Sequence, residues 1–268
     1  MFLKKISEAF NTLLFSLKSK ENLKVLYNKV RIRLTSKEER KNKEYFLNWI
    51  KSKCSDYSSL ANNISSSLWE ESLQFSTQLS EHSNKVLQTI QPKLGGGGIY
   101  PFLYFLTRLT MPLRIVETGV AAGFTSQTFL SAIKKNGKGF LYSSDFPYFR
   151  INNPEKFIGI LVEEELKKYW ELHIKGDEIN LPVIVNKIPE IDIFHYDSDK
   201  TYEGRLYATE LIENKMSKNG FIIYDDIQDN AYFYDYVQKR SPQEWYIFEF
   251  GGKYIGVIGN LKKFKKEN

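Results

Sequence analysis

Three aspartates stand directly after two short apolar runs: Asp197 after residues 191–196, and the pair Asp225 and Asp226 after residues 220–224. If both runs are parallel strands of one sheet, their carboxyl ends meet at one edge and the three carboxylates converge there. Carboxylates held that close repel one another unless a cation neutralises them, and oxygen ligands at this density suit Mg²⁺. We therefore predict a metal site at Asp197, Asp225 and Asp226. The alternative is that some of these acids only cap the following helices.

Lys200 and Tyr202 follow the first of these aspartates closely enough to reach the same site. Beside a bound Mg²⁺, Lys200 is a candidate to remove the proton of a substrate hydroxyl. An ordinary ion pair with Asp199 or Glu203 is an equally good interpretation. Tyr202 either orients the substrate or simply packs. The predicted catalytic residues are therefore Lys200, Asp197 and Tyr202.

A loop with two glycines follows an earlier apolar run, residues 114–118. Gly119 and Gly123 let the backbone turn tightly against a ligand, and a helix that begins at Thr125 or Ser126 offers free N–H groups. The spacing Glu-x-Gly-x-x-x-Gly differs from the Gly-x-Gly-x-x-Gly of pyrophosphate-binding loops. A purely structural turn is the alternative. We predict that the loop binds a cofactor through Glu117, Gly119, Ala121, Gly123, Thr125 and Ser126.

Two further aspartates end or follow strand-like runs. Asp145 closes the run at residues 139–144, where an acidic side chain can accept hydrogen bonds from both hydroxyls of a ribose. Asp177 follows the run at residues 171–175 and suits a contact with adenine or its ribose, although aspartate is also common in turns. Both residues predict a ligand that contains a nucleoside.

The elements that would position these residues alternate along the chain from residue 114. The predicted strands cover residues 114–118, 139–144, 171–175, 191–196, 220–224, 245–250 and 254–259, and the predicted helices 126–135, 154–169, 203–216 and 230–240. Such alternation is typical of a parallel sheet covered by helices on both faces. The last two strands are three residues apart and should form a hairpin. The sequence therefore predicts an α/β fold with a Rossmann-like seven-stranded sheet, mostly parallel, with an antiparallel C-terminal hairpin.

The first 90 residues have a helical pattern, with apolar residues three and four positions apart at Ile6, Phe10, Leu13, Leu14 and Leu17. We expect helices at about 37–53, 67–88 and 100–110, with a loop over 52–67. The four glycines at 95–98 predict a hinge or a loop that passes close to another part of the chain. The chain thus divides into a helical N-terminal region (1–94), a cofactor-binding domain (95–261) and a basic tail (262–268).

The net charge of +6 is concentrated at the N-terminus, where residues 1–53 hold 14 Lys and Arg against 5 Asp and Glu. The rest of the chain is slightly negative, so that composition argues against nucleic acid as a partner of the main body. The N-terminal helices either cap a substrate cleft and mediate dimerisation, or contact an anionic membrane surface.

Other classes of protein are poorly supported. No apolar run has the roughly 20 residues of a spanning helix, and the N-terminus lacks a signal-peptide cleavage site. Cys54 is the only cysteine, which fits a cytoplasmic protein, and the histidines His82, His173 and His195 have no spacing typical of a zinc site. We interpret His195, inside a strand, as structural.

The chain resembles the class I S-adenosylmethionine-dependent methyltransferases. The features that carry the resemblance are the loop at Glu117–Gly123, the terminal hairpin, and the stretches Asp197–Glu203 and Asp225–Asp226. The resemblance covers roughly residues 95–259 and is to a bacterial branch with an aspartate–serine–x–histidine–threonine–tyrosine stretch and a later double aspartate. It implies that the loop lies beside the methionine part of the cofactor and that Glu117 recognises its amino group. Lys200 stands where those relatives usually carry histidine. In catechol-type relatives, however, a catalytic lysine follows a metal-binding aspartate by three residues.

The function implied is methyl transfer from S-adenosylmethionine to a hydroxyl of a small molecule or saccharide, assisted by Mg²⁺. Two rival hypotheses stay open: a degenerate methyltransferase fold that only binds cofactor or a partner, and an NAD-dependent oxidoreductase. The glycine spacing and the hairpin count against the oxidoreductase.

Overall fold

The computed structural model describes residues 43–90, 94, 96–148 and 151–264, together with scattered positions between 11 and 27. The helix predicted around Ile6 to Leu17 and the last residues of the basic tail lie largely outside these residues. In the part of the chain that is described, no helix combines the length and the apolar character needed to cross a lipid bilayer.

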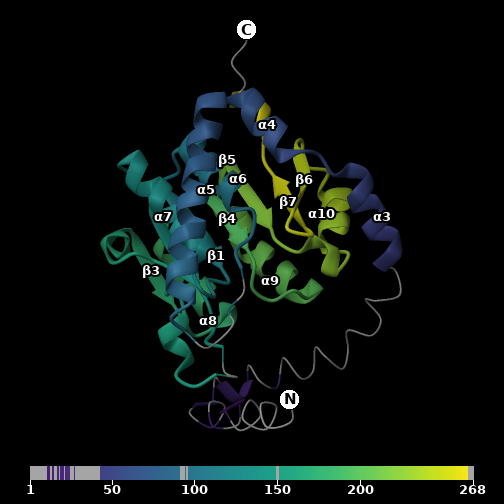
Figure 1. Cartoon of the computed structure of the whole chain (residues 1–268). Coiled ribbons are helices and arrows are strands. Elements are labelled where there is room, and N and C mark those ends of the chain that lie inside the picture. The colour runs from purple at the N-terminus through teal and green to yellow at the C-terminus, as the bar shows by residue number, and fades with distance from the viewer. Residues whose placement is uncertain are drawn as a thin grey trace.

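A seven-stranded sheet forms the centre of the molecule, in the order β3-β2-β1-β4-β5-β7-β6 (Figure 1). Strands β1 to β5 are parallel, whereas β7 lies antiparallel between β5 and β6. This arrangement confirms the predicted sheet and its terminal hairpin. The strands are β1 Arg114–Thr118, β2 Phe140–Ser144, β3 Trp170–His173, β4 Ile191–Tyr196, β5 Met216–Tyr224, β6 Trp245–Phe250 and β7 Lys253–Ile258.

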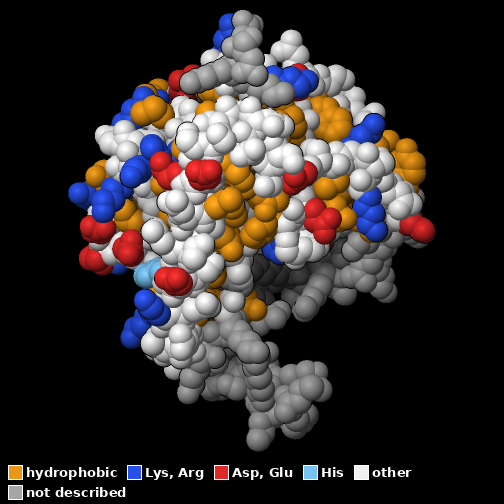
Figure 2. All heavy atoms as spheres, turned by 45° about the horizontal axis from the view of Figure 1, so that its top comes forward, with side chains coloured by type: hydrophobic (Ala, Val, Ile, Leu, Met, Phe, Trp, Pro, Cys, Tyr) orange, Lys and Arg blue, Asp and Glu red, His pale blue; other side chains and the backbone are white. Residues whose placement is uncertain are grey.

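Helices cover both faces of the sheet. Successive side chains of a strand point to opposite faces, so that apolar strands have an apolar surface to bury on each side. Ile115 and Ile193 pack into one core with α4 (Tyr57–Ile64), α5 (Ser66–Leu87), α6 (Tyr100–Thr110) and α7 (Phe124–Asn136). Their neighbours Val116 and Phe194 pack into the other core with α3 (Lys43–Lys53), α8 (Asp177–Lys187), α9 (Tyr202–Ile212) and α10 (Tyr232–Arg240). Helices from the N-terminal region thus bury the same sheet as the helices between the strands. On the face shown in Figure 2, hydrophobic side chains gather beside a hollow.

Two predicted elements are wrong, and one helix of the structure was not predicted. The expected loop over 52–67 contains α4, because Asp56 caps it by accepting hydrogen bonds from the N–H groups of Ser58 and Ser59, both at 3.0 Å. The expected helix over 154–169 is two short 3-10 helices, Pro154–Phe157 and Glu164–Tyr169, interrupted around Gly159. Helix α8 was not predicted; it contains Pro182, a residue that usually breaks a helix.

Candidate active site

The loop between β1 and α7 is held in a conformation that requires both of its glycines. Gly119 has φ +81°, and a Cβ there would lie 2.1 Å from the carbonyl oxygen of Asp197. Gly123 has φ +97°, and a Cβ there would lie 2.9 Å from the Cα of Gly159. Ala121, between them, also has a positive φ of 48°. The loop is therefore pressed between β4 on one side and the 158–163 segment on the other.

The segment around Gly159 fixes the loop from behind. The N–H of Gly159 donates to the carbonyl of Ala121 at 2.8 Å, and that of Leu161 to the carbonyl of Ala122 at 3.0 Å. His82, on α5, reaches the carbonyl of Leu161 through Nε2 at 2.9 Å. The N-terminal helices thus contribute indirectly to the position of the predicted cofactor loop.

Glu117 is fully buried at the end of β1, below the loop. Its carboxylate accepts hydrogen bonds from three hydroxyls: Thr125 Oγ1, Ser126 Oγ at 2.6 Å and Ser143 Oγ at 2.8 Å. Burial raises the pKa of Glu117 to about 7, although these hydrogen bonds act in the opposite direction. The side chains of Thr125 and Ser126 therefore bind Glu117, which leaves the backbone of the loop to face a ligand.

Glu117 should make the stability of the protein depend on pH. Because its pKa rises from 4.5 to about 7 on folding, the native state binds more protons between these values. The unfolding free energy should therefore fall as the pH rises through this window, by about 3 kcal/mol from this group. Urea denaturation of the wild type and Glu117→Gln from pH 4 to 8 measures the difference, and groups common to both proteins cancel. Parallel curves would show that Glu117 titrates normally.

Asp145 and Asp177 lie at the same edge of the sheet as the loop. Asp145 accepts the N–H of Ala121 at 2.8 Å through Oδ2, so that it contacts the loop directly. Asp177, in the first turn of α8, accepts hydrogen bonds from the hydroxyls of Ser144, at 2.5 Å, and Ser198. The structure therefore brings all the predicted cofactor-binding residues to one region.

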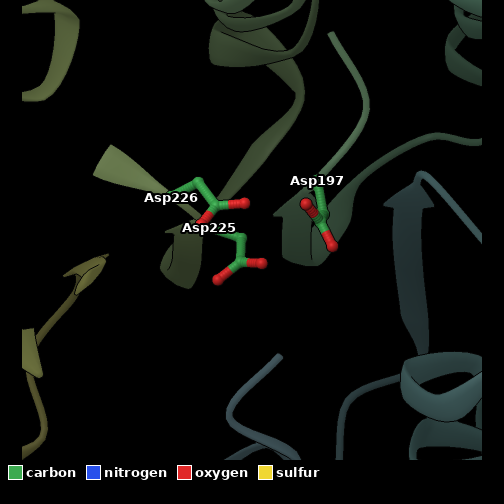
Figure 3. A group of neighbouring side chains, drawn as sticks. All are labelled: Asp197, Asp225 and Asp226. Atoms are coloured by element: carbon green, nitrogen blue, oxygen red, sulfur yellow. The ribbon is translucent and has the colours of Figure 1, made fainter. Parts of the chain in front are cut away.

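The three aspartates also meet, as the sequence predicted. Asp197 follows β4, Asp225 and Asp226 follow β5, and one carboxylate oxygen from each lies within 4.8 Å of the others. Figure 3 shows the carboxylates of Asp225 and Asp226 turned toward Asp197. Asp225 is 1% exposed and Asp226 4%. Burial, and then the charge of Asp225, raise the pKa of Asp197 to about 7.

Two lysines neutralise part of this charge. Lys200 contacts Asp226 Oδ2 closely and lies 3.5 Å from Asp197 Oδ1. Lys253 lies 3.2 Å from Asp226 Oδ2 and 3.4 Å from Asp225 Oδ2. Lys200 thus forms ion pairs, but with the aspartates of the cluster. Lys253 was missed because it lies far along the chain, on β7, and no motif connects it to Asp225.

The carboxylate oxygens of the three aspartates differ in what they contact. Both oxygens of Asp226 have partners, since Oδ1 accepts from Gln228 Nε2 at 2.9 Å and Oδ2 faces the two lysines. The buried atoms Asp197 Oδ1 and Asp225 Oδ1 have no hydrogen-bond partner. Such buried acceptors are costly unless a cation or proton lies beside them. The oxygens of the cluster that accept no hydrogen bond are therefore Oδ1 of Asp197, which Lys200 Nζ approaches to 3.5 Å, and Oδ1 of Asp225.

Arg205, which the sequence analysis also missed, lies beneath the double aspartate. It is completely buried, and Nη2 donates to the backbone carbonyls of Asp225 and Asp226 at 2.8 and 2.9 Å. Its Nη1 donates to Asn230 Oδ1 at 3.2 Å, and Asn230 in turn donates to the carbonyl of Lys200 at 3.1 Å. Arg205 and Asn230 thus hold the turn after β5 against the segment that carries Lys200.

Tyr202 and His195 have structural contacts. The hydroxyl of Tyr202 donates to Asp235 Oδ2 on α10 at 2.9 Å, and its ring packs edge-on against Tyr232. His195 is buried inside β4 beside Phe129, and burial lowers its pKa to about 4. Its neutral, buried state agrees with the interpretation of His195 as structural.

Part of the chain is similar to known methyltransferases. The model of the methyltransferase-domain family matches residues 116–227. The ribosomal RNA large subunit methyltransferase E of Methanosphaera stadtmanae is 26% identical over 120 residues, which are 44% of this chain and 58% of that protein. The chain thus aligns with little more than half the length of this curated relative.

Solved structures share the fold. The O-methyltransferase TomG of Streptomyces achromogenes, involved in tomaymycin synthesis and solved with S-adenosylmethionine, superposes with a TM-score of 0.54 and 15% identity, covering 68% of this chain and 89% of that one. An O-methyltransferase of Bacillus cereus, solved with S-adenosylhomocysteine, gives a TM-score of 0.50 and 16% identity, covering 72% and 91%.

Proposed function

We propose that this chain is a methyltransferase, because residues 116–227 match the methyltransferase-domain family and the sheet has the fold of the solved O-methyltransferases, and that it transfers a methyl group from S-adenosylmethionine to a hydroxyl of a small acceptor. The observation that carries the proposal is the position of the aspartate–lysine cluster directly beside the glycine loop, joined by the contact of Gly119 with Asp197. A donor at the loop and an acceptor at the cluster would then be neighbours, as a displacement at the methyl carbon requires.

The residues around the loop suit the cofactor. The backbone of residues 119–123 would face its methionine part, and Asp145 would accept hydrogen bonds from the ribose. Asp177 would contact the adenine or its ribose. When bound, S-adenosylmethionine supplies an activated methyl group on a sulfonium. The protein has to hold that group in line with the acceptor oxygen and exclude water.

The acidic cluster suits a divalent cation held by two aspartates. Asp197 and Asp225 would bind it through their Oδ1 atoms, which accept no hydrogen bond and are oxygen ligands of the kind that Mg²⁺ prefers; the Oδ1 of Asp197 lies 3.5 Å from Lys200 Nζ. Both oxygens of Asp226 already have partners, so we assign Asp226 a different role: its Oδ2 would hold Lys200 and Lys253 in place. A cation there would stabilise the negative charge that develops on the acceptor oxygen. Lys200, which contacts Asp226 and lies 3.5 Å from Asp197 Oδ1, is placed to exchange a proton with a hydroxyl bound beside Asp197.

A ribosomal RNA acceptor is the second candidate. The similarity to ribosomal RNA large subunit methyltransferase E favours it. The charge distribution counts against it, since the excess of Lys and Arg lies in residues 1–53 and the domain that carries the site is slightly negative. Methyl transfer to total RNA in the assay below would favour RNA over a small acceptor.

The test is a calorimetric titration with S-adenosylhomocysteine, with NADH as the control ligand, in Mg²⁺ and again in EDTA. We expect micromolar binding of S-adenosylhomocysteine alone. Transfer of labelled methyl groups to a panel of phenols, sugars and RNA then measures the activity. Binding without transfer to any acceptor would indicate a degenerate methyltransferase, tight NADH binding would indicate an oxidoreductase, and no binding of either ligand would exclude the cofactor site.

A further inference from the structure

Three aromatic side chains lie near the glycine loop and the aspartate–lysine cluster. Phe124 is the first residue of α7 and follows Gly123 directly. Its ring stacks at 6.5 Å, with planes 25° apart, on Tyr100, the first residue of α6. Tyr100 in turn meets Phe250 edge-on at 5.2 Å, at the end of β6. These three rings come from separate elements and form one continuous wall.

The wall reaches the cluster at two points. Phe250 is paired with Lys253 across the β6–β7 hairpin, and Lys253 contacts Asp225 and Asp226. The loop before α6 supplies the second point, because a Cβ on Gly98 would lie 3.6 Å from the carboxylate of Asp225. Gly97 lies against Phe124, where a Cβ would be 2.4 Å from the Cβ of that residue. The glycine-rich segment therefore passes close to both the wall and the cluster, which confirms one of the two alternatives predicted for it.

Tyr100 and Phe124 are not needed to fill the protein core. Both are only half-buried, and neither belongs to the two core clusters of the described residues, whereas Phe250 packs against the first cluster. Half-exposed rings beside a polar site present flat apolar surface to whatever binds there. A flat aromatic ring can make offset-stacked or edge-to-face contacts with these rings, which a saturated ring cannot make as a π-system.

We propose that Tyr100, Phe124 and Phe250 form the acceptor subsite and that this subsite takes a flat, hydroxylated ring in preference to a sugar or an aliphatic alcohol. The proposal rests on the proposed function, since it assumes that the acceptor lies between loop and cluster. The ring of the acceptor lies against Tyr100, and its hydroxyl points to Asp197 and Asp225. Tyr100 and Phe124 are therefore specificity-determining residues.

The test compares two alcohols with the same hydroxymethyl group, benzyl alcohol on a flat aromatic ring and cyclohexylmethanol on a puckered saturated ring; the saturated ring is the more hydrophobic, so tighter binding of benzyl alcohol cannot come from hydrophobicity alone. Their hydroxymethyl groups are alike, so that metal binding and acidity contribute little to any difference. Titration of protein saturated with S-adenosylhomocysteine, followed by NMR, gives both dissociation constants. We expect benzyl alcohol to bind about tenfold more tightly, which corresponds to one or two aromatic contacts.

Two variants distinguish the contribution of the wall to binding from general effects on the fold. Tyr100→Leu keeps an apolar side chain but removes the flat surface, and should abolish the preference by weakening benzyl alcohol alone. Tyr45→Leu is the matched control, because Tyr45 is an exposed tyrosine on α3 that contacts Tyr234 instead. Its preference should equal that of the wild type.

Equal affinities for both alcohols in the wild type, or an equal loss for both in Tyr100→Leu, would overturn the subsite while leaving cofactor binding intact. Failure to bind S-adenosylhomocysteine would overturn the proposed function itself, and the subsite with it.

Discussion

Replacement of Asp225 by asparagine is expected to lower kcat/KM for methyl transfer at least ~100-fold, with the affinity for S-adenosylhomocysteine changed less than twofold. Asparagine has the shape of aspartate but removes the charge from a buried oxygen that has no hydrogen-bond partner. A cation or an acceptor proton held there would lose its ligand, whereas the glycine loop would keep its own contacts. Initial rates with labelled S-adenosylmethionine, over a range of Mg²⁺ concentrations, measure the effect.

Two further variants make this experiment specific. Asp226→Asn should retain its response to Mg²⁺, because the oxygens of Asp226 contact Gln228 and the two lysines. Glu249→Gln, which alters an exposed carboxylate on β6, should behave as the wild type. Full turnover of Asp225→Asn in EDTA would exclude the cluster from the chemistry.

Gly119→Ala is expected to weaken the binding of S-adenosylhomocysteine at least ~100-fold and to reduce the unfolding free energy by about 3 kcal/mol. Alanine is strained at a φ of +81°, and its Cβ would meet the carbonyl oxygen of Asp197 at 2.1 Å. That oxygen belongs to the backbone, so relief requires the loop and the end of β4 to separate. Calorimetry and urea denaturation measure the two effects.

Gly137 supplies a matched control for Gly119. It also has a positive φ, +67°, but a Cβ there would meet nothing within 4 Å. Gly137→Ala should therefore lose only the ~1 kcal/mol of backbone strain and keep its cofactor affinity. Equal affinities in the two variants would show that the contact between Gly119 and Asp197 does not shape the cofactor site.

The sequence by itself predicted the sheet, its hairpin, the glycine loop and the three converging aspartates. These features depend on short-range patterns. Runs of β-branched and aromatic residues favour strands, and a parallel sheet places the residues after its strands at one edge. Asp197, Asp225 and Asp226 could therefore be grouped without knowing any side-chain contact. Helix α8, which contains Pro182, was not predicted from these patterns.

Only the tertiary structure decided which residues contact each aspartate of the cluster. Lys253 reaches Asp225 only because β7 pairs antiparallel with β5, which no local pattern near residue 253 reveals. Arg205 lies on a helix whose sequence favours solvent exposure for a long basic side chain, yet it is buried under the turn after β5. Lys253 thus pairs with carboxylate oxygens of Asp225 and Asp226, and Arg205 holds the backbone carbonyls of the same two residues. Contacts between residues far apart in the chain are set by register and packing, so the sequence could propose the acids but not their roles.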